Sequence, residues 1–423
     1  MIAAGPFLAL LLAPLPGSVE PVDDHSALLG AGGRGGRGLA LYAGKVLTMA
    51  DDQPVIDRGV LLVRDGKIDA IGSRDDLEVP ADFAVIDLGE QWLLPGLIDL
   101  HCHIAGSMQD INGAVYQANP GLRVETAIVP DNEYLRRAVA AGVTTVLFIP
   151  GSATTIGGQS VLLKTYGEHY EDLRLRAPAG MKLAQADNPK RWGWGMGRLT
   201  LNWHIRHVLQ RGLAAAREAE RSGEPIDPQW EIFASLADGT NQIAAHTQQY
   251  QVVYSTLRIV KQELGLDVFV DHGTMDGFHA AGLAQELGVP AILGPRSVSR
   301  KNNARRIDHD GKTVGVAAAW QERGHTTIGF NTDAPVVAQE QLPLQAAMGA
   351  RYGFDDSAMQ TLRGLTIVPA RTVQIDDRVG SLEVGKDADL IVVAGHPIDP
   401  RNRVEQVFVE GRLVYDAEEG QRF

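Results

Sequence analysis

Five residues have the types and spacing expected of a hydrolytic metal site. His101 and His103 end one apolar segment, and residues two apart on a strand point to the same face. His246 and His272 each end a further apolar segment, and Asp333 follows another. Histidine nitrogens and a carboxylate are the ligands of hydrolytic zinc sites, which keep one position open for water. A bound divalent ion lowers the pKa of that water toward about 7. The set therefore predicts metal-dependent hydrolysis, with Asp333 binding metal and taking up the water's proton.

The prediction depends on the set rather than on any one member. A single histidine at a strand end is more often an ordinary polar residue than a metal ligand. Five such residues, each at the end of a different predicted element or in the His-x-His pair, are hard to produce by chance. Other histidines lie on predicted helices or loops and are expected in surface or core positions; they are His169, His204, His207, His279, His309 and His325.

Lys182 lies inside another apolar segment, between Met181 and Leu183. Alternation along a strand directs Met181 and Leu183 toward covering helices and Lys182 toward the interior. A buried, unpaired ammonium group is costly, so Lys182 must be neutralised, paired or modified. Two alternatives follow: a carboxylated lysine that bridges two metal ions, or a salt bridge to a carboxylate such as Asp187.

Short apolar segments alternate with helical patterns in the middle of the chain, as in βα units around a parallel sheet. The predicted strands are Leu97–Ile104, Val143–Ile149, Ser160–Thr165, Met181–Ala184, Gln242–His246, Val268–His272, Ala291–Leu293 and Thr326–Phe330. The predicted helices include Asp131–Ala141, Thr200–Ser222, Gln249–Leu264 and Met275–Leu287. This α/β pattern predicts a (β/α)8 TIM barrel, whose active site lies at the carboxyl ends of the strands.

Both ends of the chain predict short strands and turns instead. The N-terminal strands are Leu39–Met49, Gly59–Arg64, Lys67–Ile71 and Phe83–Leu88, and the C-terminal strands are Asp389–Val393, Val404–Val409 and Leu413–Tyr415. Gly30–Gly38 has the composition of a flexible linker. Met1–Pro16 is apolar but too short to cross a bilayer, and no positive segment precedes it. It predicts either an export signal, with a periplasmic or secreted location, or else a mis-called start or a floppy extension of a cytoplasmic protein.

The 423 residues carry 39 Lys+Arg and 52 Asp+Glu, a net charge of −13. An acidic balance without a long basic run argues against a nucleic-acid or anionic-membrane surface. No second apolar segment approaches membrane length. Cys102 is the only cysteine, which excludes an intramolecular disulfide and a multi-cysteine zinc module. The expected partner is a small-molecule substrate, and a homo-oligomer is compatible with the sequence.

From Leu39 onward the sequence resembles the amidohydrolase superfamily, specifically its imidazolonepropionase-like branch of metal-dependent hydrolases. The motifs that carry the resemblance are Leu93-Leu94-Pro95-Gly96-Leu97-Ile98-Asp99-Leu100-His101-Cys102-His103, Ala141-Gly142-Val143-Thr144-Thr145, Pro150-Gly151-Ser152 with Gly157-Gly158-Gln159, and Asp376-Asp377-Arg378-Val379-Gly380-Ser381-Leu382-Glu383-Val384-Gly385-Lys386-Asp387-Ala388-Asp389-Leu390.

The resemblance implies a barrel plus a small composite β-sandwich domain built from both ends of the chain. We therefore expect an extension at 1–38, the β-sandwich at 39–94 and 371–423, and the barrel at 95–370. The resemblance also implies one or two divalent metal ions, usually zinc. The metal-site residues that it implies are His101, His103, His246, His272 and, as acidic ligand and base, Asp333.

The sequence departs from this branch in three places. Where relatives tend to have Gly-Glu-Asn-Pro-Lys-Arg, His-x-His and Asp-His-Pro, this chain has Ala186-Asp187-Asn188-Pro189-Lys190-Arg191, Ala244-Ala245-His246 and Asp333-Ala334-Pro335. The minimal metal-binding set remains, whereas groups that would shape a second metal site or hold substrate are changed. Relative to its family, the chain is expected to favour a single metal, a shifted substrate or loss of activity.

The leading hypothesis is hydrolysis of a C–N bond in an amide, cyclic amide or amino-heterocycle. Water activated at the histidine cluster attacks the planar carbon, and Asp333 carries a proton to the leaving nitrogen. His272 either completes a second metal site with Lys182 or polarises the developing oxyanion. The glycine-rich segment Ser152–Gln159 is expected to line the pocket. The alternatives are a non-catalytic scaffold or ligand-binding relative, and a mononuclear deaminase.

Overall fold

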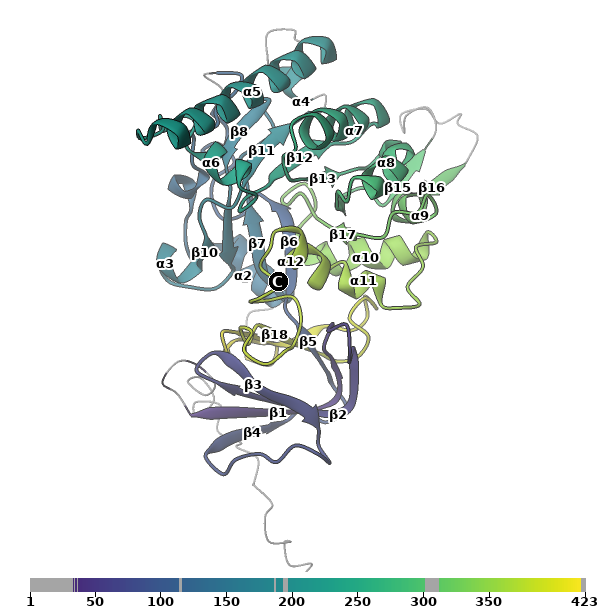
Figure 1. Ribbon diagram of the computed structural model, residues 1–423. Coiled ribbons are helices and arrows are strands. Elements are labelled where there is room, and N and C mark those ends of the chain that lie inside the picture. Colours follow the sequence, from purple (N-terminus) through teal and green to yellow (C-terminus); the bar gives the residue numbers. More distant parts are fainter. Residues whose placement is uncertain are drawn as a thin grey trace, which may run out of the picture.

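The computed structural model describes residues 37–113, 116–185, 188–192, 197–300 and 312–419, together with Gly33 and Gly35. Most of the expected extension at 1–38 lies outside these ranges. One sheet, built from both ends of the chain, lies beside a larger part that holds the remaining strands and the helices (Figure 1). Within the described ranges, no helix is both long and apolar enough to cross a membrane.

Both ends of the chain form one eight-stranded sheet with the order β20-β19-β18-β5-β1-β2-β3, in which β4 also pairs with β1. Strand β5 joins the two ends, because it is parallel to β1 and antiparallel to β18. It is not predicted from the sequence, since four residues are too few to show a period. Alternation buries Leu39 and Leu41 in one core cluster and Ala40 in another, so both faces are covered. The strands are β1 Gly38–Leu47, β2 Val55–Arg64, β3 Lys67–Ser73, β4 Phe83–Asp87, β5 Trp92–Pro95, β18 Leu390–Val393, β19 Val404–Val409 and β20 Arg412–Asp416.

Two further sheets contain the strands predicted for the middle of the chain. Their orders are β17-β14-β13-β12-β11-β8 and β10-β9-β7-β6. Neighbours from β11 to β17 in the first sheet are parallel, as are β6 and β7 in the second. These strands are buried along their whole length, which explains their continuous apolar sequences. Their bounds are β6 Leu97–Cys102, β7 Val143–Phe148, β8 Ile156–Gln159, β9 Val161–Lys164, β10 Arg174–Arg176, β11 Met181–Ala184, β12 Ile243–Thr247, β13 Val268–His272, β14 Ala291–Leu293 and β17 Ile328–Phe330, with a separate hairpin of β15 Val298–Arg300 and β16 Thr313–Gly315.

Helices lie between most of these strands. The longest, α5, ends at Gly223, whose φ of 72° is the left-handed conformation that favours glycine after a helix. The predicted helix at Gln249–Leu264 is present as α7 followed by a π-helical segment, η2. The helices are η1 Val124–Ala127, α2 Glu133–Ala140, α3 Tyr170–Leu173, α4 Asn188–Trp192, α5 Arg198–Ser222, α6 Ile232–Ala237, α7 Tyr250–Thr256, η2 Leu257–Glu263, η3 Gly277–Ala280, α8 Ala281–Glu286, α9 Val316–Gln321, η4 Gln339–Gln341, α10 Leu342–Arg351, α11 Gln360–Arg363 and α12 Ile367–Thr372.

The third predicted strand, Ser160–Thr165, differs from its expected role. It is present as β9 but runs antiparallel to β7, and the preceding β8 runs antiparallel to β11. A parallel return requires a crossover, usually through a helix. The chain between Phe148 and Val161 contains β8 and no helix, so β9 pairs as the antiparallel arm of a local excursion.

Strand β6 also approaches the segment that follows β17. Cys102 and Ala334 form a parallel bridge, and the His103 amide donates to the Ala334 carbonyl oxygen at 2.8 Å. The first and last strands of this part of the chain are therefore neighbours at their carboxyl ends. This contact brings His101 and His103 close to Asp333, which the sequence separates by more than two hundred residues.

A buried charge cluster connects the terminal sheet to the other sheets. Lys164, on β9 and 2% exposed, donates to Asp387 Oδ2 at 3.0 Å and to Asp389. Asp387 also accepts from Lys67 on β3 and from Arg378 Nη2 at 2.7 Å. The C-terminal motif that contains Asp387 and Asp389 therefore joins three separate parts of the chain.

Replacing Asp387 by asparagine is expected to lower the free energy of unfolding at pH 7 by about 3 kcal/mol, because it leaves buried Lys164 with one carboxylate. Burial raises the pKa of Asp387, but Lys164, Lys67 and Arg378 outweigh burial and lower it from 3.8 to about 2. The ionised carboxylate therefore stabilises the fold above about pH 4, and this contribution is lost as the pH falls toward about 2. Urea unfolding should show a difference from wild type that shrinks over this interval.

The matched control for this substitution is Asp57→Asn, since the Asp57 side chain is 80% exposed in the same sheet. It is expected to change the free energy of unfolding by less than about 0.5 kcal/mol. Equal losses in the two variants, or an Asp387→Asn effect that does not change with pH, would contradict the stabilising role of the charge cluster.

Candidate metal centre

All six residues predicted for the metal site lie together. They come from four strands of two sheets, most of them at or just after the carboxyl end of the strand, and from the segment after β17. All are buried except Asp333, whose side chain is 14% exposed. The six are His101 and His103 from β6 and its end, Lys182 from β11, His246 from β12, His272 from β13 and Asp333 from the segment after β17.

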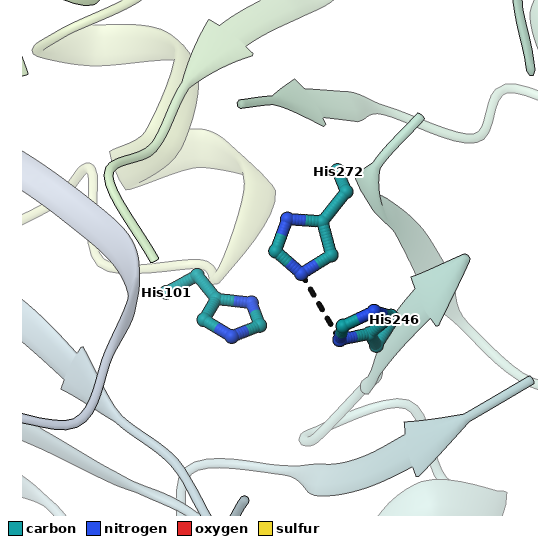
Figure 2. A group of neighbouring side chains, drawn as sticks. All are labelled: His101, His246 and His272. Atoms are coloured by element: carbon teal, nitrogen blue, oxygen red, sulfur yellow. Dashed lines mark hydrogen bonds between the residues drawn. The ribbon is translucent and has the colours of Figure 1, made fainter. Parts of the chain in front are cut away.

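His101, His246 and His272 form the first of two groups with metal-ligand geometry. One ligand atom from each lies within 4.8 Å of the others. His272 Nε2 is 3.0 Å from His246 Nδ1, and the ring centroids of His101 and His272 are 4.4 Å apart. Figure 2 shows the three rings converging on a common space from three separate strands. Three imidazoles at this spacing can share one ion.

His101, His103 and Asp333 form the second group. His101 Nε2 is 3.2 Å from His103 Nε2 and 3.1 Å from Asp333 Oδ1, and His103 Nε2 is 3.5 Å from the same oxygen. The other Asp333 oxygen, Oδ2, is 3.9 Å from His272 Nε2. The Asp333 carboxylate thus lies against both groups, which have His101 in common.

The outer nitrogens of three imidazoles are occupied by acceptors. His103 Nδ1 donates to the Ile149 carbonyl oxygen at 2.9 Å, His272 Nδ1 to the Gly294 carbonyl oxygen at 2.8 Å, and His101 Nδ1 to Asp271. Such partners fix the ring orientation and tautomer of metal-binding histidines. Because each Nδ1 is engaged, each Nε2 offers its lone pair to the centre. The residues present therefore fit a divalent ion.

Lys182 occupies the interior position that alternation predicts. Met181 and Leu183 belong to the apolar core, whereas Lys182 is fully buried on the opposite side of β11. Its Nζ lies 3.4 Å from His101 Nε2 and 3.6 Å from Asp271 Oδ2. Asp187, the partner suggested from sequence, lies outside the described residues. Among the described residues, the carboxylate within ion-pair distance of Lys182 is Asp271.

Asp271 is the site residue that sequence reasoning missed. It is fully buried, accepts from His101 Nδ1 and from Asn331 Nδ2 at 3.2 Å, and forms an ion pair with Lys182 Nζ at 3.6 Å. Its signal in the sequence was a carboxylate directly before His272 inside an apolar strand. Strict alternation would send these two neighbours to opposite faces. His272 has a φ of 79°, so the chain turns there and both side chains reach the site.

Two site residues have a strained backbone. His272 and Asp333 have φ values of 79° and 51°, in the left-handed region that non-glycine residues seldom adopt. Each such conformation costs on the order of 1–3 kcal/mol and persists only where the surroundings hold it. Such strain clusters at functional sites, which agrees with the ligand geometry at these two positions.

The electrostatics of the site favour a bound cation. Burial lowers the pKa of His246 well below its usual value and that of His272 to about 4, so both rings are neutral at pH 7. Neutral imidazole is the form that binds metal. Burial also lowers the pKa of His101, but Asp271 and Asp333 outweigh it and raise that pKa. The two carboxylates therefore attract positive charge to the centre.

Replacing Asp271 by asparagine is expected to weaken metal binding by about 10–100-fold, the usual cost of losing a partner that orients a metal ligand. The amide retains the shape but not the charge that holds His101 and Lys182. Competition with a chromophoric chelator measures the affinity. Asp276→Asn is the control, since Asp276 follows the same strand and its carboxylate accepts from the Tyr250 amide instead. Unchanged affinity in the Asp271 variant would contradict its orienting role.

Ser152 adds a hydroxyl to the edge of the centre. Its Oγ is 2.8 Å from His246 Nδ1, and Gln248 Nε2 is 3.5 Å from the other ring nitrogen. Ser152 begins the glycine-rich segment predicted to line the pocket. It is only partly buried.

Comparisons with known proteins agree with this geometry. The amidohydrolase family model matches residues 273–414. Amidohydrolase tasK of Hapsidospora irregularis is 26% identical over 95% of this chain, which covers 42% of that protein. An imidazolonepropionase of Klebsiella pneumoniae is 30% identical over 87% of this chain and 94% of its own length. An amidohydrolase of known structure from Thermotoga maritima has a TM-score of 0.78 at 27% identity, covering 89% of this chain and 100% of its own.

The fold shared with the Thermotoga maritima protein is of the TIM-barrel type with an additional domain. Proteins of this family generally use a divalent metal, and the histidine-rich cluster described above has the ligands to bind one. The family membership expected from the sequence motifs is confirmed. This chain belongs to the amidohydrolase family, in its imidazolonepropionase-like branch, and is a hydrolase of carbon–nitrogen bonds.

Proposed function

We propose that the chain hydrolyses a C–N bond of a small amide, cyclic amide or amino-heterocycle at a divalent metal, preferably zinc. The observation that carries the proposal is the convergence of imidazole nitrogens and one carboxylate from distant segments within 4.8 Å of one another. When bound, such an ion lowers the pKa of a water toward about 7 and polarises a carbonyl group. The residues that would hold it are His101, His103, His246, His272 and Asp333.

Asp333 is the residue best placed to move a proton. Its carboxylate spans the two ligand groups, with one oxygen 3.1 Å from His101 Nε2 and the other 3.9 Å from His272 Nε2. It is also the most exposed of the six site residues, so a substrate can reach it. Asp333 would take a proton from the attacking water and deliver it to the leaving nitrogen. The Ser152 hydroxyl would orient the substrate beside His246.

One ion is favoured over two. Both ligand groups contain His101, and its Nδ1 is engaged by Asp271, so His101 can donate the lone pair of Nε2 to a single ion. Asp271 also provides Lys182 with the salt bridge that an unmodified, buried lysine requires. Lys182 would therefore act as an unmodified cation that holds Asp271 and His101 in place. The alternative is a carboxylated Lys182 bridging two ions.

Two features support the finer architecture that we propose, a closed (β/α)8 barrel at 95–370 with a composite β-sandwich at 39–94 and 371–423. The parallel bridge between Cys102 and Ala334 lies where the first and last strands of a barrel would meet. The eight-stranded sheet combines strands from both ends of the chain, as the composite domain requires.

The substrate class follows from the relatives. Several are imidazolonepropionases, whose name denotes a cyclic imidazolone substrate, and one is an enamidase. Cyclic amides are accordingly the first compounds to assay, followed by linear amides and amino-heterocycles. The departures at Ala244 and Ala334 remove two histidines typical of relatives, so we expect a substrate other than that of the imidazolonepropionases.

Elemental analysis of the purified chain, combined with hydrolysis assays, tests the proposal. We expect about one zinc per chain, loss of activity on chelation and recovery on adding Zn²⁺. Ammonia release from amino-heterocycles alone would indicate a deaminase instead. Two ions per chain, with loading that depends on bicarbonate, would support a carboxylated Lys182. Well-folded protein that binds no metal and hydrolyses none of the three classes would overturn the proposal in favour of a non-catalytic relative.

A further inference from the structure

Asp99 is a buried carboxylate whose hydrogen bonds join the two ends of the metal centre. It is 0% exposed and lies two residues before His101 on β6. Its Oδ1 accepts from the His101 amide at 3.0 Å. Its Oδ2 accepts from the Thr332 amide at 3.1 Å, the Thr332 hydroxyl at 2.6 Å and Gln339 Nε2 at 2.8 Å. In the described part of the chain no lysine or arginine forms an ion pair with it, so its hydrogen-bond partners are these uncharged donors.

Thr332 transmits this anchoring to its neighbour Asp333. The Thr332 hydroxyl also accepts from the Ala334 amide at 3.1 Å, so contacts on both sides of Asp333 are fixed. Asp333 has a φ of 51°, a conformation that would relax if the flanking residues were free. The Ala334 carbonyl oxygen in turn accepts from the His103 amide at 2.8 Å. These bonds hold the turn that contains Asp333 against the strand that contains the two histidines.

We infer that Asp99 is a positioning residue, which acts through Thr332 to hold the Asp333 carboxylate beside His101 and His103. Among the described residues, the hydrogen bonds to the Asp99 carboxylate come from two backbone amides, the Thr332 hydroxyl and Gln339, and none comes from a ligand atom. A buried carboxylate without a cation is costly, and an apolar residue would fill the same space without that cost. What the Asp99 carboxylate provides is the geometry of the turn that contains Asp333. The inference depends on the proposed function, because it assigns Asp333 as a metal ligand and base.

A double-mutant cycle on metal affinity tests the inference without any substrate. Affinity for Zn²⁺ is measured by competition with a chromophoric chelator for wild type, Asp99→Asn, Asp333→Asn and the double variant. Asparagine preserves size and one acceptor oxygen but turns an NH2 group toward donors. We expect Asp99→Asn to weaken binding by about 10–100-fold. If Asp99 acts through Asp333, the double variant should match Asp333→Asn to within about threefold.

A milder pair of substitutions at Thr332 covers the case in which Asp99→Asn fails to fold. Thr332→Val removes the hydroxyl but retains the shape, and it should weaken Zn²⁺ binding in the same direction as Asp99→Asn. Thr332→Ser retains the hydroxyl and should bind Zn²⁺ as wild type does. If Thr332 only stabilised the fold, the two variants could differ in melting temperature but would bind Zn²⁺ with equal affinity.

The outcomes distinguish failure of this inference from failure of the proposed function. Multiplicative losses in the double variant, wild-type affinity in Asp99→Asn, or equal affinities in the two Thr332 variants would overturn the positioning role. Wild-type Zn²⁺ affinity and turnover in Asp333→Asn alone would instead overturn the role that the proposed function gives to Asp333, and the inference with it. A chain that binds no zinc in any form would show that the proposed function itself is wrong.

Discussion

Replacing His101 by alanine is expected to remove the bound metal and to lower hydrolysis by at least about 10³-fold, which corresponds to about 4 kcal/mol of lost catalysis. His101 is the one residue shared by both ligand groups, so no complete set remains without it. The substitution also leaves Asp271 and Lys182 without their common neighbour. Elemental analysis should find less metal in the variant than in wild type, and this readout requires no known substrate.

The control for this substitution is His207→Ala. His207 is exposed on α5, where its ring stacks on Trp203, and within the described residues no hydrogen bond, ion pair or ring contact joins it to the six site residues. Its replacement is expected to leave the metal content and activity unchanged. Retention of stoichiometric metal in His101→Ala, or loss of metal from both variants, would contradict the assignment of His101 to the centre.

The second large effect is expected on turnover when Asp333 is replaced by asparagine. A positioned general acid–base typically contributes about 10²–10⁴-fold, and the amide cannot accept a proton. Chemical steps should therefore slow by this factor, seen as a lower kcat with a smaller change in KM. The measurement uses the best substrate found among cyclic amides, linear amides and amino-heterocycles, with the variant saturated with Zn²⁺ to separate catalysis from metal loading.

Glu340→Gln provides the matched control in the same region of the chain. Glu340 lies on η4 and is paired with Arg137 on α2, away from the ligand atoms. Loss of this partly exposed pair is expected to change stability by about 1 kcal/mol or less and to leave kcat unchanged. A full-activity Asp333→Asn enzyme, or comparable losses of kcat in the two variants, would exclude Asp333 as the proton carrier.

Much of the centre was predictable because its signals are local. The His-x-His pair, His246 and His272 each end an apolar run, and the carboxyl ends of parallel strands gather at one edge of a sheet. The side of β11 on which Lys182 lies follows from two-residue alternation alone. These predictions required only the strand period and the preference of buried segments for apolar residues. Hence the structure places all six predicted residues together.

The residues that support the ligands could not be predicted in the same way. Asp271 precedes His272, and regular alternation sends it to the opposite face; only the left-handed backbone at His272 brings both side chains to the centre. Asp99 was visible as part of a motif, but its contact with Thr332 joins positions 233 residues apart. Likewise, the antiparallel direction of β9 depends on its pairing partner and not on its own apolar sequence.

The sequence by itself indicated which residues could bear the chemistry and which segments become strands, because composition and short-range period govern solvent exposure and backbone preference. It also determined membership of the family through motifs near the site and at the C-terminal end. The tertiary structure alone decided that Asp271 pairs with Lys182 and orients His101, and that Asp99 bonds to the turn that contains Asp333. Those choices depend on long-range pairing of strands, where a single left-handed residue or a bridge such as Cys102 to Ala334 sets the distances between side chains that no local pattern encodes.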